Sequence, residues 1–186
     1  MRVFDFDNTI YRGESVFDFY LFSLRYNPRA AKLIFTVLSY VLKYKTGRMT
    51  IEQLKTGCAK YAHDYIASFP DPEKMVVSFW NSHMKKIKKW YDPQQDDIIM
   101  TASFNVIMDE ICKRLGVSRC VCSVINKDTL EVEYLNFSKN KKDKFMEMFG
   151  DTEIDEFYTD NISDMPMAEI AKSAYLVRGN KIKRIK

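Results

Sequence analysis

Short apolar runs alternate with amphipathic stretches over the second half of the chain. The runs predict buried strands, and the stretches between them, where apolar residues recur every three or four positions, predict helices. Strands that alternate with helices indicate a parallel sheet covered on both faces, so we expect an α/β fold. Two turn sequences, Asn126-Lys127-Asp128 and Arg178-Gly179-Asn180, each predict a hairpin. The expected strands are 3–7, 97–101, 117–125, 130–134, 156–159 and 174–177, and the expected helices are 104–115, 139–149 and 165–173.

The segment from 13 to 95 has the pattern of four consecutive helices without a strand. In the first, apolar residues at helical spacing are Phe17, Tyr20, Leu21 and Leu24. The second, from Ala30 to Tyr44, has only about ten uncharged residues between its lysines. A membrane span needs about twenty, so this run predicts a core or interfacial helix.

Capping signals mark the third and fourth helices of this segment. Thr50 followed by Gln53 is a capping box, and it opens a helix expected to run through Leu54, Cys58, Tyr61 and Tyr65. Asp71 is a plausible cap for the fourth helix, with Pro72 at its first position. The inward stripe expected for the fourth helix is Val76, Phe79, Trp80, His83, Met84 and Ile87, and the lysines from 85 to 89 are expected to be solvated. The chain therefore divides into a core domain, 1–12 and 96–186, and a helical insert, 13–95.

Composition is that of a globular protein, with 46% hydrophobic and 14% aromatic residues. The net charge of +4 permits an anionic substrate, but the chain has no recognisable nucleic-acid-binding module, so we expect no nucleic-acid partner. None of the four cysteines forms a CxxC pair, which argues against a structural zinc site. No signal peptide precedes the first acidic motif, and we expect a reduced, cytoplasmic protein.

Polar side chains gather where the expected strands end. Asp5 and Asp7 follow the first strand and point to the same side of the extended backbone. The second strand ends in Thr101-Ala102-Ser103, which places Thr101 and Ser103 there, and the cluster Asp160-Asn161-Ile162-Ser163-Asp164 follows a later strand. Ligands of parallel sheets bind beyond the carboxyl ends of the strands, so these groups are expected on one rim.

Four carboxylates on one rim need a countercharge. A hard divalent cation such as Mg²⁺, together with a lysine, would supply it and leave room for a substrate phosphate. One aspartate could then attack phosphorus while another moves a proton, with Thr101 and the lysine holding the phosphoryl oxygens. Residue types and positions alone also fit a carboxylate-bound cation site without turnover.

Over nearly its whole length, the chain resembles the haloacid dehalogenase superfamily of phosphohydrolases. The stretch Asp5-Phe6-Asp7-Asn8-Thr9 looks like the first motif of that family, and Ile98-Ile99-Met100-Thr101 resembles the second. The resemblance implies a Rossmann-like parallel sheet, an aspartyl-phosphate formed on Asp5, and Asp7 as the general acid and base. It also implies that Thr101, with Ala102 beside it, binds phosphate.

The fourth motif of the family resembles the stretch from Asp160 to Asp164. The resemblance implies that Asp160 binds Mg²⁺ together with Asp5 and the backbone carbonyl of Asp7, while Asp164 and Asn161 support the site.

The third motif contributes a phosphate-binding lysine that opens a helix, with apolar residues four and seven or eight positions later. Lys141 meets this rule through Phe145, Met148 and Phe149, whereas Lys142 reaches only Met146. We therefore expect Lys141 to be that lysine.

A helical insert between the first two motifs is typical of the phosphoserine-phosphatase-like branch, and residues 13–95 match its position. The resemblance implies a cap that selects the leaving group of a small-molecule phosphate ester. Glu14 and Arg48 are candidates for contacting an amino-acid head group. The apolar run from Phe17 to Tyr44 also resembles caps that act on phosphorylated lipids, with peripheral membrane contact as an option, although a packed cap needs the same residues. Phosphotransfer to another alcohol and non-catalytic binding stay open as alternatives to hydrolysis.

Overall fold

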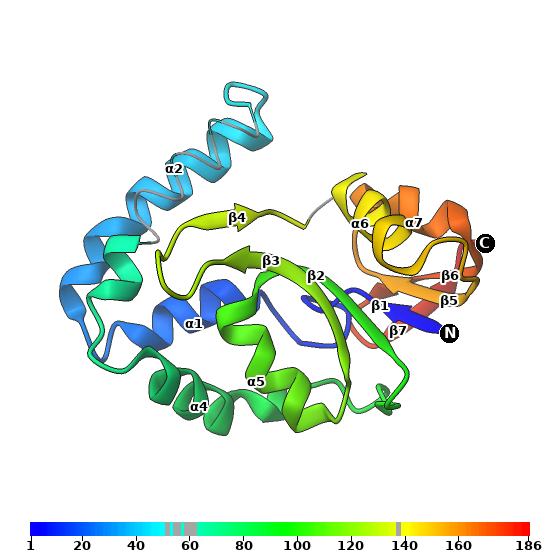
Figure 1. Ribbon diagram of the computed structural model, residues 1–186, viewed down its shortest axis with the longest axis horizontal. Coiled ribbons are helices and arrows are strands. Elements are labelled where there is room, and N and C mark those ends of the chain that lie inside the picture. Colours follow the sequence, from blue (N-terminus) through cyan, green and yellow to red (C-terminus); the bar gives the residue numbers. More distant parts are fainter. Residues whose placement is uncertain (51–52, 54–56, 58–62, 137–138) are drawn as a thin grey trace.

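The computed structural model describes residues 1–50, 53, 57, 63–136 and 139–186. It contains a seven-stranded sheet in the order β4-β3-β2-β1-β5-β6-β7. Strands β3, β2, β1, β5 and β6 run parallel, and β4 and β7 join the two edges antiparallel. Figure 1 shows helices on both sides of this sheet, with α2 projecting from one end of the molecule. The expected α/β fold is therefore confirmed.

The bounds of the elements agree with the sequence pattern for most of the core. The strands are β1 (Arg2–Phe4), β2 (Ile98–Phe104), β3 (Arg119–Ile125), β4 (Val132–Tyr134), β5 (Ile154–Thr159), β6 (Ala171–Arg178) and β7 (Lys181–Arg184). The helices are α1 (Ser15–Ser23), α2 (Leu33–Lys45), α4 (Pro72–His83), α5 (Asn105–Leu115), α6 (Lys139–Phe149) and α7 (Met165–Ile170), with short 3₁₀ turns η1 (Pro28–Lys32), η2 (Met84–Lys86) and η3 (Ile162–Asp164).

The core forms two hydrophobic clusters, one on each face of the sheet. Successive side chains of a strand point to opposite faces, so Phe4 joins the cluster that includes α4 and α5, whereas Val3 joins the one that includes α6 and α7. Strand β1 lies at the centre, where Val3 pairs with Ile98 of β2 and with Phe157 of β5. The carboxyl ends of β2, β1 and β5 therefore meet at one rim.

The predicted helix ends are largely confirmed. Asp71 Oδ1 accepts a hydrogen bond from the backbone N–H of Lys74 at 2.9 Å, and α4 begins at Pro72. Gly116 ends α5 with φ of +70°, a conformation that costs glycine little. Thr50 and Gln53 make both bonds of the capping box, at 2.9 and 3.2 Å. The predicted continuation of that helix through Leu54, Cys58 and Tyr61 lies outside the described residues.

Three local details differ from the sequence pattern. The expected first helix is present as α1, but it buries Phe19 and Phe22 and leaves Phe17 and Leu21 exposed, because apolar residues surround this helix and spacing does not select a face. Helix α7 stops at Ile170 and β6 begins at Ala171, where pairing with Ile154 of β5 overrides helical spacing. Helix α4 ends at His83, so Met84 and Ile87 of its expected stripe lie beyond it.

Helices from the 13–95 segment pack directly on the sheet. Phe19, Phe79 and Trp80 belong to the same hydrophobic cluster as Phe4 of β1. Trp80 Nε1 also donates a hydrogen bond of 2.8 Å to the carbonyl of Ile107 in α5. The division into core and insert stays a prediction, and helices α1 and α4 of the insert share their core with the sheet.

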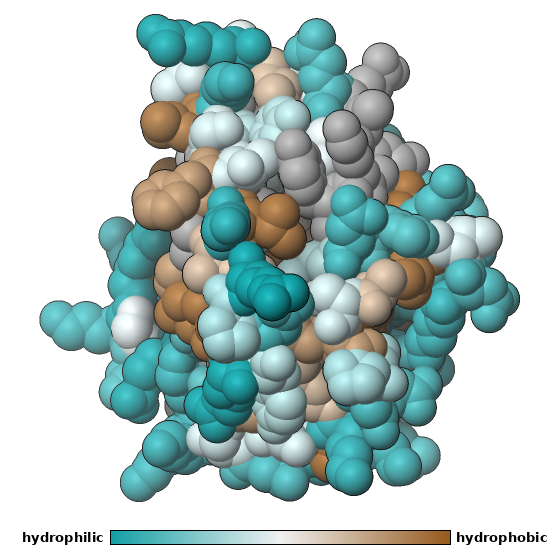
Figure 2. Space-filling model, turned by 90° about the vertical axis from the view of Figure 1, so that its left-hand side faces the viewer, coloured by the Kyte–Doolittle hydropathy of each residue, from teal (hydrophilic) through white to brown (hydrophobic). Residues whose placement is uncertain are grey.

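The surface over α1 and α2 retains several large apolar side chains. Figure 2 shows apolar residues interspersed with hydrophilic ones on that side of the molecule. Within the described ranges, no helix is both long enough and apolar enough to cross a bilayer. The expected cytoplasmic location and the absence of a nucleic-acid partner stay predictions. The exposed apolar residues of this region are Val16, Phe17, Leu21, Tyr26, Phe35 and Leu42.

Candidate active site

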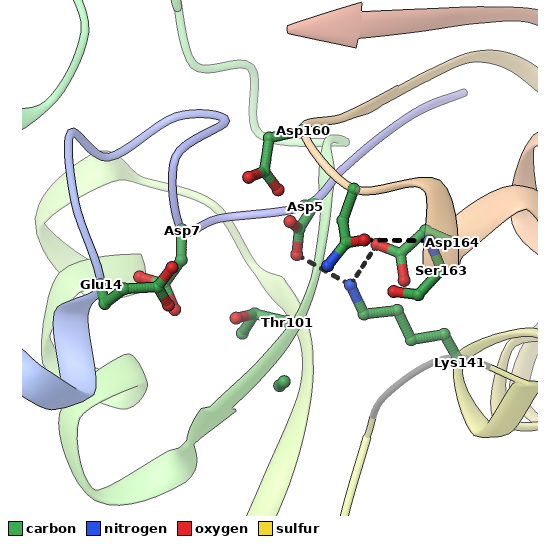
Figure 3. A pocket seen from close by; sticks show the side chains of 10 residues that line it. Asp5, Asp7, Glu14, Thr101, Lys141, Asp160, Ser163 and Asp164 are labelled. Carbon is green, nitrogen blue, oxygen red and sulfur yellow. Dashed lines mark hydrogen bonds and ion pairs between the residues drawn. The ribbon is translucent and has the colours of Figure 1, made fainter. Parts of the chain in front are cut away.

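A pocket of about 130 Å³ opens at the rim where β2, β1 and β5 end. Figure 3 shows Asp7 and Glu14 on one side of it and Lys141 reaching in from the other. It holds five carboxylates and one lysine, so its charge before any ligand binds is strongly negative. The lining residues are Asp5, Asp7, Glu14, Thr101, Ala102, Lys141, Asp160, Asn161, Ser163 and Asp164.

Asp5 lies at the floor of the pocket, directly after β1. Its backbone N–H donates a 2.8 Å hydrogen bond to the carbonyl of Tyr158, which extends the pairing of β1 with β5 by one residue. Its side chain is 9% exposed, and Oδ1 accepts a 2.8 Å bond from Lys141 Nζ. Burial raises the pKa of Asp5 to about 6, and the neighbouring ammonium limits that rise.

Lys141 links two carboxylates from different strand ends. Its Nζ lies 2.8 Å from Asp5 Oδ1 and 2.6 Å from Asp164 Oδ2, and the side chain is buried. Burial acts against its charge, but the two carboxylates outweigh this effect and raise the pKa of Lys141 above its usual value. Thr159 adds a 3.1 Å hydrogen bond to the same oxygen of Asp164. The lysine selected from helical spacing therefore does lie in the pocket.

Asp7 is held by the start of α1 and by β2. Its Oδ1 accepts the backbone N–H of Ser15 at 2.7 Å, and its Oδ2 accepts the hydroxyl of Ser103 at 2.6 Å. The hydroxyl oxygens of Ser15 and Ser103 are 2.8 Å apart, so a hydrogen bond between them fixes both side chains. Burial raises the pKa of Asp7 to about 6, against the effect of these hydrogen bonds. A carboxyl with that pKa is suited to exchange protons near neutral pH.

Thr101 and Ala102 form the β2 side of the pocket, where the pairing with β3 shifts register. Behind them, the buried side chain of Asn136 donates to the carbonyls of Thr101 at 3.0 Å and Val121 at 2.8 Å. Ser123 donates a 2.7 Å bond to the carbonyl of Ala102. These contacts fix the backbone that faces the pocket.

Asp160 follows β5 and lines the same pocket as Asp5. Burial raises the pKa of Asp160, and adjacent Asn161 caps the next turn by accepting the N–H of Ser163 at 3.0 Å. Carboxylates that share one buried pocket repel each other unless a proton or a cation offsets their charge. Oxygen donors of this kind fit Mg²⁺. Among the described residues, no group of three or more His, Cys, Asp or Glu side chains is arranged to hold a metal ion.

All eight residues that the sequence predicted for the site line this one pocket. Of the two head-group candidates, Glu14 lines it and its carboxylate accepts a 2.8 Å bond from Asn8, whereas Arg48 is not among the lining residues. Ser103, expected on this rim, lies there and donates to Asp7, whereas sequence reasoning missed Ser15 and Asn136. A helix start at Ser15 was the available signal for the first, but no local pattern marks Asn136.

A model of the haloacid dehalogenase-like hydrolase family matches residues 3–169 of the chain. A search of curated proteins found no match. Among solved structures, a protein of unknown function from Bordetella pertussis Tohama I is similar, with a TM-score of 0.67 and 15% identity over 94% of this chain and 87% of that one.

Two further solved structures are larger than this chain. A HAD family hydrolase from Salmonella enterica serovar Typhi has a TM-score of 0.55 and 12% identity, over 91% of this chain and 59% of its own. A probable phosphoserine phosphatase from Vibrio cholerae has a TM-score of 0.55 and 10% identity, over 92% of this chain and 54% of its own. This chain thus spans little more than half the length of these two proteins, and at such identities the likeness concerns the fold.

Proposed function

This chain belongs to the haloacid dehalogenase-like hydrolases, and on that premise we propose that it is a Mg²⁺-dependent phosphatase that cleaves a phosphate monoester through an aspartyl-phosphate on Asp5. The observation that carries the proposal is the position of Lys141, which lies between Asp5 and Asp164 in a pocket that also holds Asp7. A nucleophile, a proton donor and a fixed cation within one pocket are what phosphoryl transfer requires.

In the first half of the reaction, a carboxylate oxygen of Asp5 attacks phosphorus and the bond from phosphorus to the ester oxygen breaks. Asp7, protonated in a fraction of molecules because its pKa is about 6, donates its proton to the leaving oxygen, and the alcohol departs. Lys141 and the backbone at Thr101 and Ala102 hold the phosphoryl oxygens, where negative charge develops.

In the second half, Asp7 is ionised and acts as the base. It takes a proton from water while the water oxygen attacks phosphorus of the aspartyl-phosphate. The bond from phosphorus to Asp5 breaks, which restores the Asp5 carboxylate and releases inorganic phosphate. Ser15 and Ser103 hold the Asp7 carboxylate in place during both proton transfers.

The donors around Asp5 suit Mg²⁺. The carboxylates of Asp5 and Asp160 and the backbone carbonyl of Asp7 would hold the ion, and Asp164 and Asn161 would support that side of the pocket. When bound, Mg²⁺ neutralises the carboxylates and polarises the phosphoryl oxygens. These residues carry too many negative charges to accept a phosphate dianion without it.

Residues 13–95 serve as the helical cap in this proposal. Glu14 is the lining residue that this segment contributes, and it stands at the pocket edge beside Asp7. It is therefore placed to contact the organic part of the substrate, a small-molecule phosphate ester.

Hydrolysis of p-nitrophenyl phosphate with and without Mg²⁺ tests the proposal. The wild type should turn over only with the metal, and chelation should stop it reversibly. Asp5→Asn should lose activity by at least about 10³-fold while the fold, followed by circular dichroism, is retained. The matched control is Asp128→Asn, because Asp128 is exposed in the turn between β3 and β4.

Acid quenching followed by peptide mass spectrometry should find a phosphoryl group on the peptide that contains Asp5, and none in Asp5→Asn. Equal release of phosphate and alcohol would identify water as the acceptor rather than a second alcohol. If Asp5→Asn hydrolyses the ester as fast as Asp128→Asn, the assignment of Asp5 as nucleophile is wrong.

A further inference from the structure

A second cavity, of about 320 Å³, adjoins the candidate active site. It lies beyond the end of β6, where the loop after β1 and the stretch after η2 come together. The two cavities share one wall, because Asp160 lines both. The residues around the second cavity are Asn8, Arg12, Lys88, Asp160, Val177, Arg178 and Gly179.

The charge of the second cavity is opposite to that of the first. Arg12, Lys88 and Arg178 contribute three positive charges, and Asp160 is the one carboxylate in its lining. An excess of cationic N–H donors around a hollow of this size favours an anionic ligand. Arginine in particular matches carboxylate and phosphate oxygens with paired N–H donors.

Lys88 differs from most lysines because the residue is only 3% exposed, so its positive charge is buried. Its ammonium donates to the carbonyl of Asn8, and its backbone N–H donates a 2.8 Å bond to the carbonyl of Ile10. The neighbouring bridge between Tyr11 and Ile87 fixes the same two stretches together. Burial lowers the pKa of Lys88, and the nearby Asp160 carboxylate opposes that shift. An ammonium has three N–H donors, and the Asn8 carbonyl takes one of them.

Two arginines, Arg12 and Arg178, also line the cavity. Arg178 ends β6, and its Nη1 donates a 2.6 Å bond to the backbone carbonyl of Asp160, which places its guanidinium beside the shared wall. Arg12 is exposed, and its backbone N–H donates a 2.9 Å bond to the carbonyl of Lys86. Both guanidinium groups have N–H donors left for a ligand.

We infer that this cavity binds a second anionic group of the substrate. The preferred substrate is then a phosphate monoester whose organic part carries a carboxylate or a second phosphate, with its ester phosphate beside Asp5 and its second anion among Arg12, Lys88 and Arg178. The inference rests on the proposed phosphatase function. It also explains how an anionic substrate approaches a pocket with five carboxylates, because the adjoining cations offset their field.

A series of ω-carboxyalkyl phosphates of two to six carbons, each paired with the n-alkyl phosphate of equal length, tests this inference. At the best length, kcat/KM should be at least about tenfold higher for the carboxylate member. Arg12→Gln should remove most of that preference through a higher KM. Arg119→Gln is the matched control. Arg119 is an exposed arginine at the amino end of β3, whereas the rim lies at the carboxyl ends of the strands. A preference near one at every length, or equal effects of the two variants, would overturn the inference.

Binding to Asp5→Asn, measured by calorimetry with Mg²⁺, separates this inference from the phosphatase proposal. If the wild type hydrolyses no ester but Asp5→Asn binds the carboxyalkyl phosphates more tightly than the alkyl ones, and Arg12→Gln removes the difference, the phosphatase proposal fails and the anion site stands. If inorganic phosphate alone binds in an Arg12-dependent manner and the paired esters bind equally, the cavity takes a free anion, and the substrate inference is wrong.

Discussion

The ammonium of Lys141 lies 2.8 Å from Oδ1 of Asp5, although 136 positions separate the two residues in the chain. The same ammonium is 2.6 Å from Asp164 Oδ2. One lysine therefore neutralises part of a carboxylate cluster that would otherwise repel itself, and it occupies one oxygen of Asp5. In the proposed mechanism the lysine has two roles, because it holds the site together and would also bind a phosphoryl oxygen.

Replacement of Lys141 by methionine should reduce kcat/KM for p-nitrophenyl phosphate by about 10²–10³-fold, the usual effect of losing one group that stabilises developing charge. Lys142→Met is the matched control, because Lys142 is not among the residues that line the pocket. It should change the rate less than about threefold. Similar losses in both variants would contradict the assignment of Lys141.

Loss of the Ser103 hydroxyl should shift the pH profile. The hydrogen bond from Ser103 stabilises ionised Asp7, so Ser103→Ala should raise the pKa of Asp7 above its present value of about 6. A bond to a charged group is worth about 1.5–3 kcal/mol, which corresponds to about one pKa unit or more. Since the first step needs protonated Asp7, the alkaline limb of kcat/KM should move to higher pH.

The control for this shift is Ser118→Ala, because Ser118 is exposed just before β3 and its hydroxyl donates to the carbonyl of Gln95. Its pH profile should match that of the wild type. A Ser103→Ala profile that falls in rate without moving along the pH axis would mean that Ser103 does not control the ionisation of Asp7.

Metal should stabilise the fold more at pH 7.5 than at pH 5. The folded state raises the pKa of Asp5 and of Asp7 to about 6, so it favours their protonated forms. The stability they contribute is present below their unfolded pKa near 4 and is lost as pH rises through about 6. Magnesium binds the ionised forms and should offset this loss where it is largest.

At about 100 times its Kd, a bound ion adds about 2.7 kcal/mol to the free energy of unfolding, or about 5–10 °C in Tm for a chain of this size. We expect that rise at pH 7.5 and less than half of it at pH 5, measured by thermal melting with Mg²⁺ and with chelator. Asp160→Asn should lose most of the metal effect at both pH values. An equal Mg²⁺-dependent rise in Tm at both pH values in the wild type would contradict the link between metal binding and ionisation of Asp5 and Asp7.

Asn136→Ala should destabilise the protein and weaken substrate binding together. It leaves the buried carbonyls of Thr101 and Val121 without their side-chain donor, at about 1–3 kcal/mol each. We expect a loss of about 2–4 kcal/mol in urea unfolding and a higher KM, because the backbone beside Thr101 is no longer fixed. In Asn140→Ala, which removes an exposed 3.0 Å bond to the carbonyl of Leu135, the loss should stay below about 1 kcal/mol.

Much of the site was predictable because one rule about parallel sheets applies to it. The carboxyl ends of parallel strands share an edge, so Asp5, Thr101 and Asp160 had to meet once their strands were recognised. Lys141 was chosen through the resemblance to the third motif of the family, whose lysine opens a helix with apolar residues at set positions, and Phe145 at one of these positions is buried. The first inference depends on local sequence patterns, and the second depends also on the family resemblance.

The parts that were not predictable depend on distant contacts. Asn136 follows β4, and its side chain bonds to the carbonyl of Thr101, 35 positions earlier in the chain, where the pairing of β2 with β3 shifts register. Lys88 belongs to a lysine-rich stretch that is expected to be solvated, yet it is buried, because after the η2 turn its backbone N–H bonds to the carbonyl of Ile10 and its ammonium to that of Asn8. No local sequence pattern indicates either the contact of Asn136 or the burial of Lys88.

Strand β1 is three residues long, and it joins the centre of the sheet only through partners far along the chain, Ile98 on one side and Phe157 on the other. Contacts between residues far apart in the chain form slowly, because a long loop must lose entropy on closing before the stabilising contact forms. Asp5, the proposed nucleophile at the end of this strand, is therefore in place only after β1 has paired with β2 and β5. During refolding, helical signal should return before enzymatic activity, so that activity is a late marker of the native state.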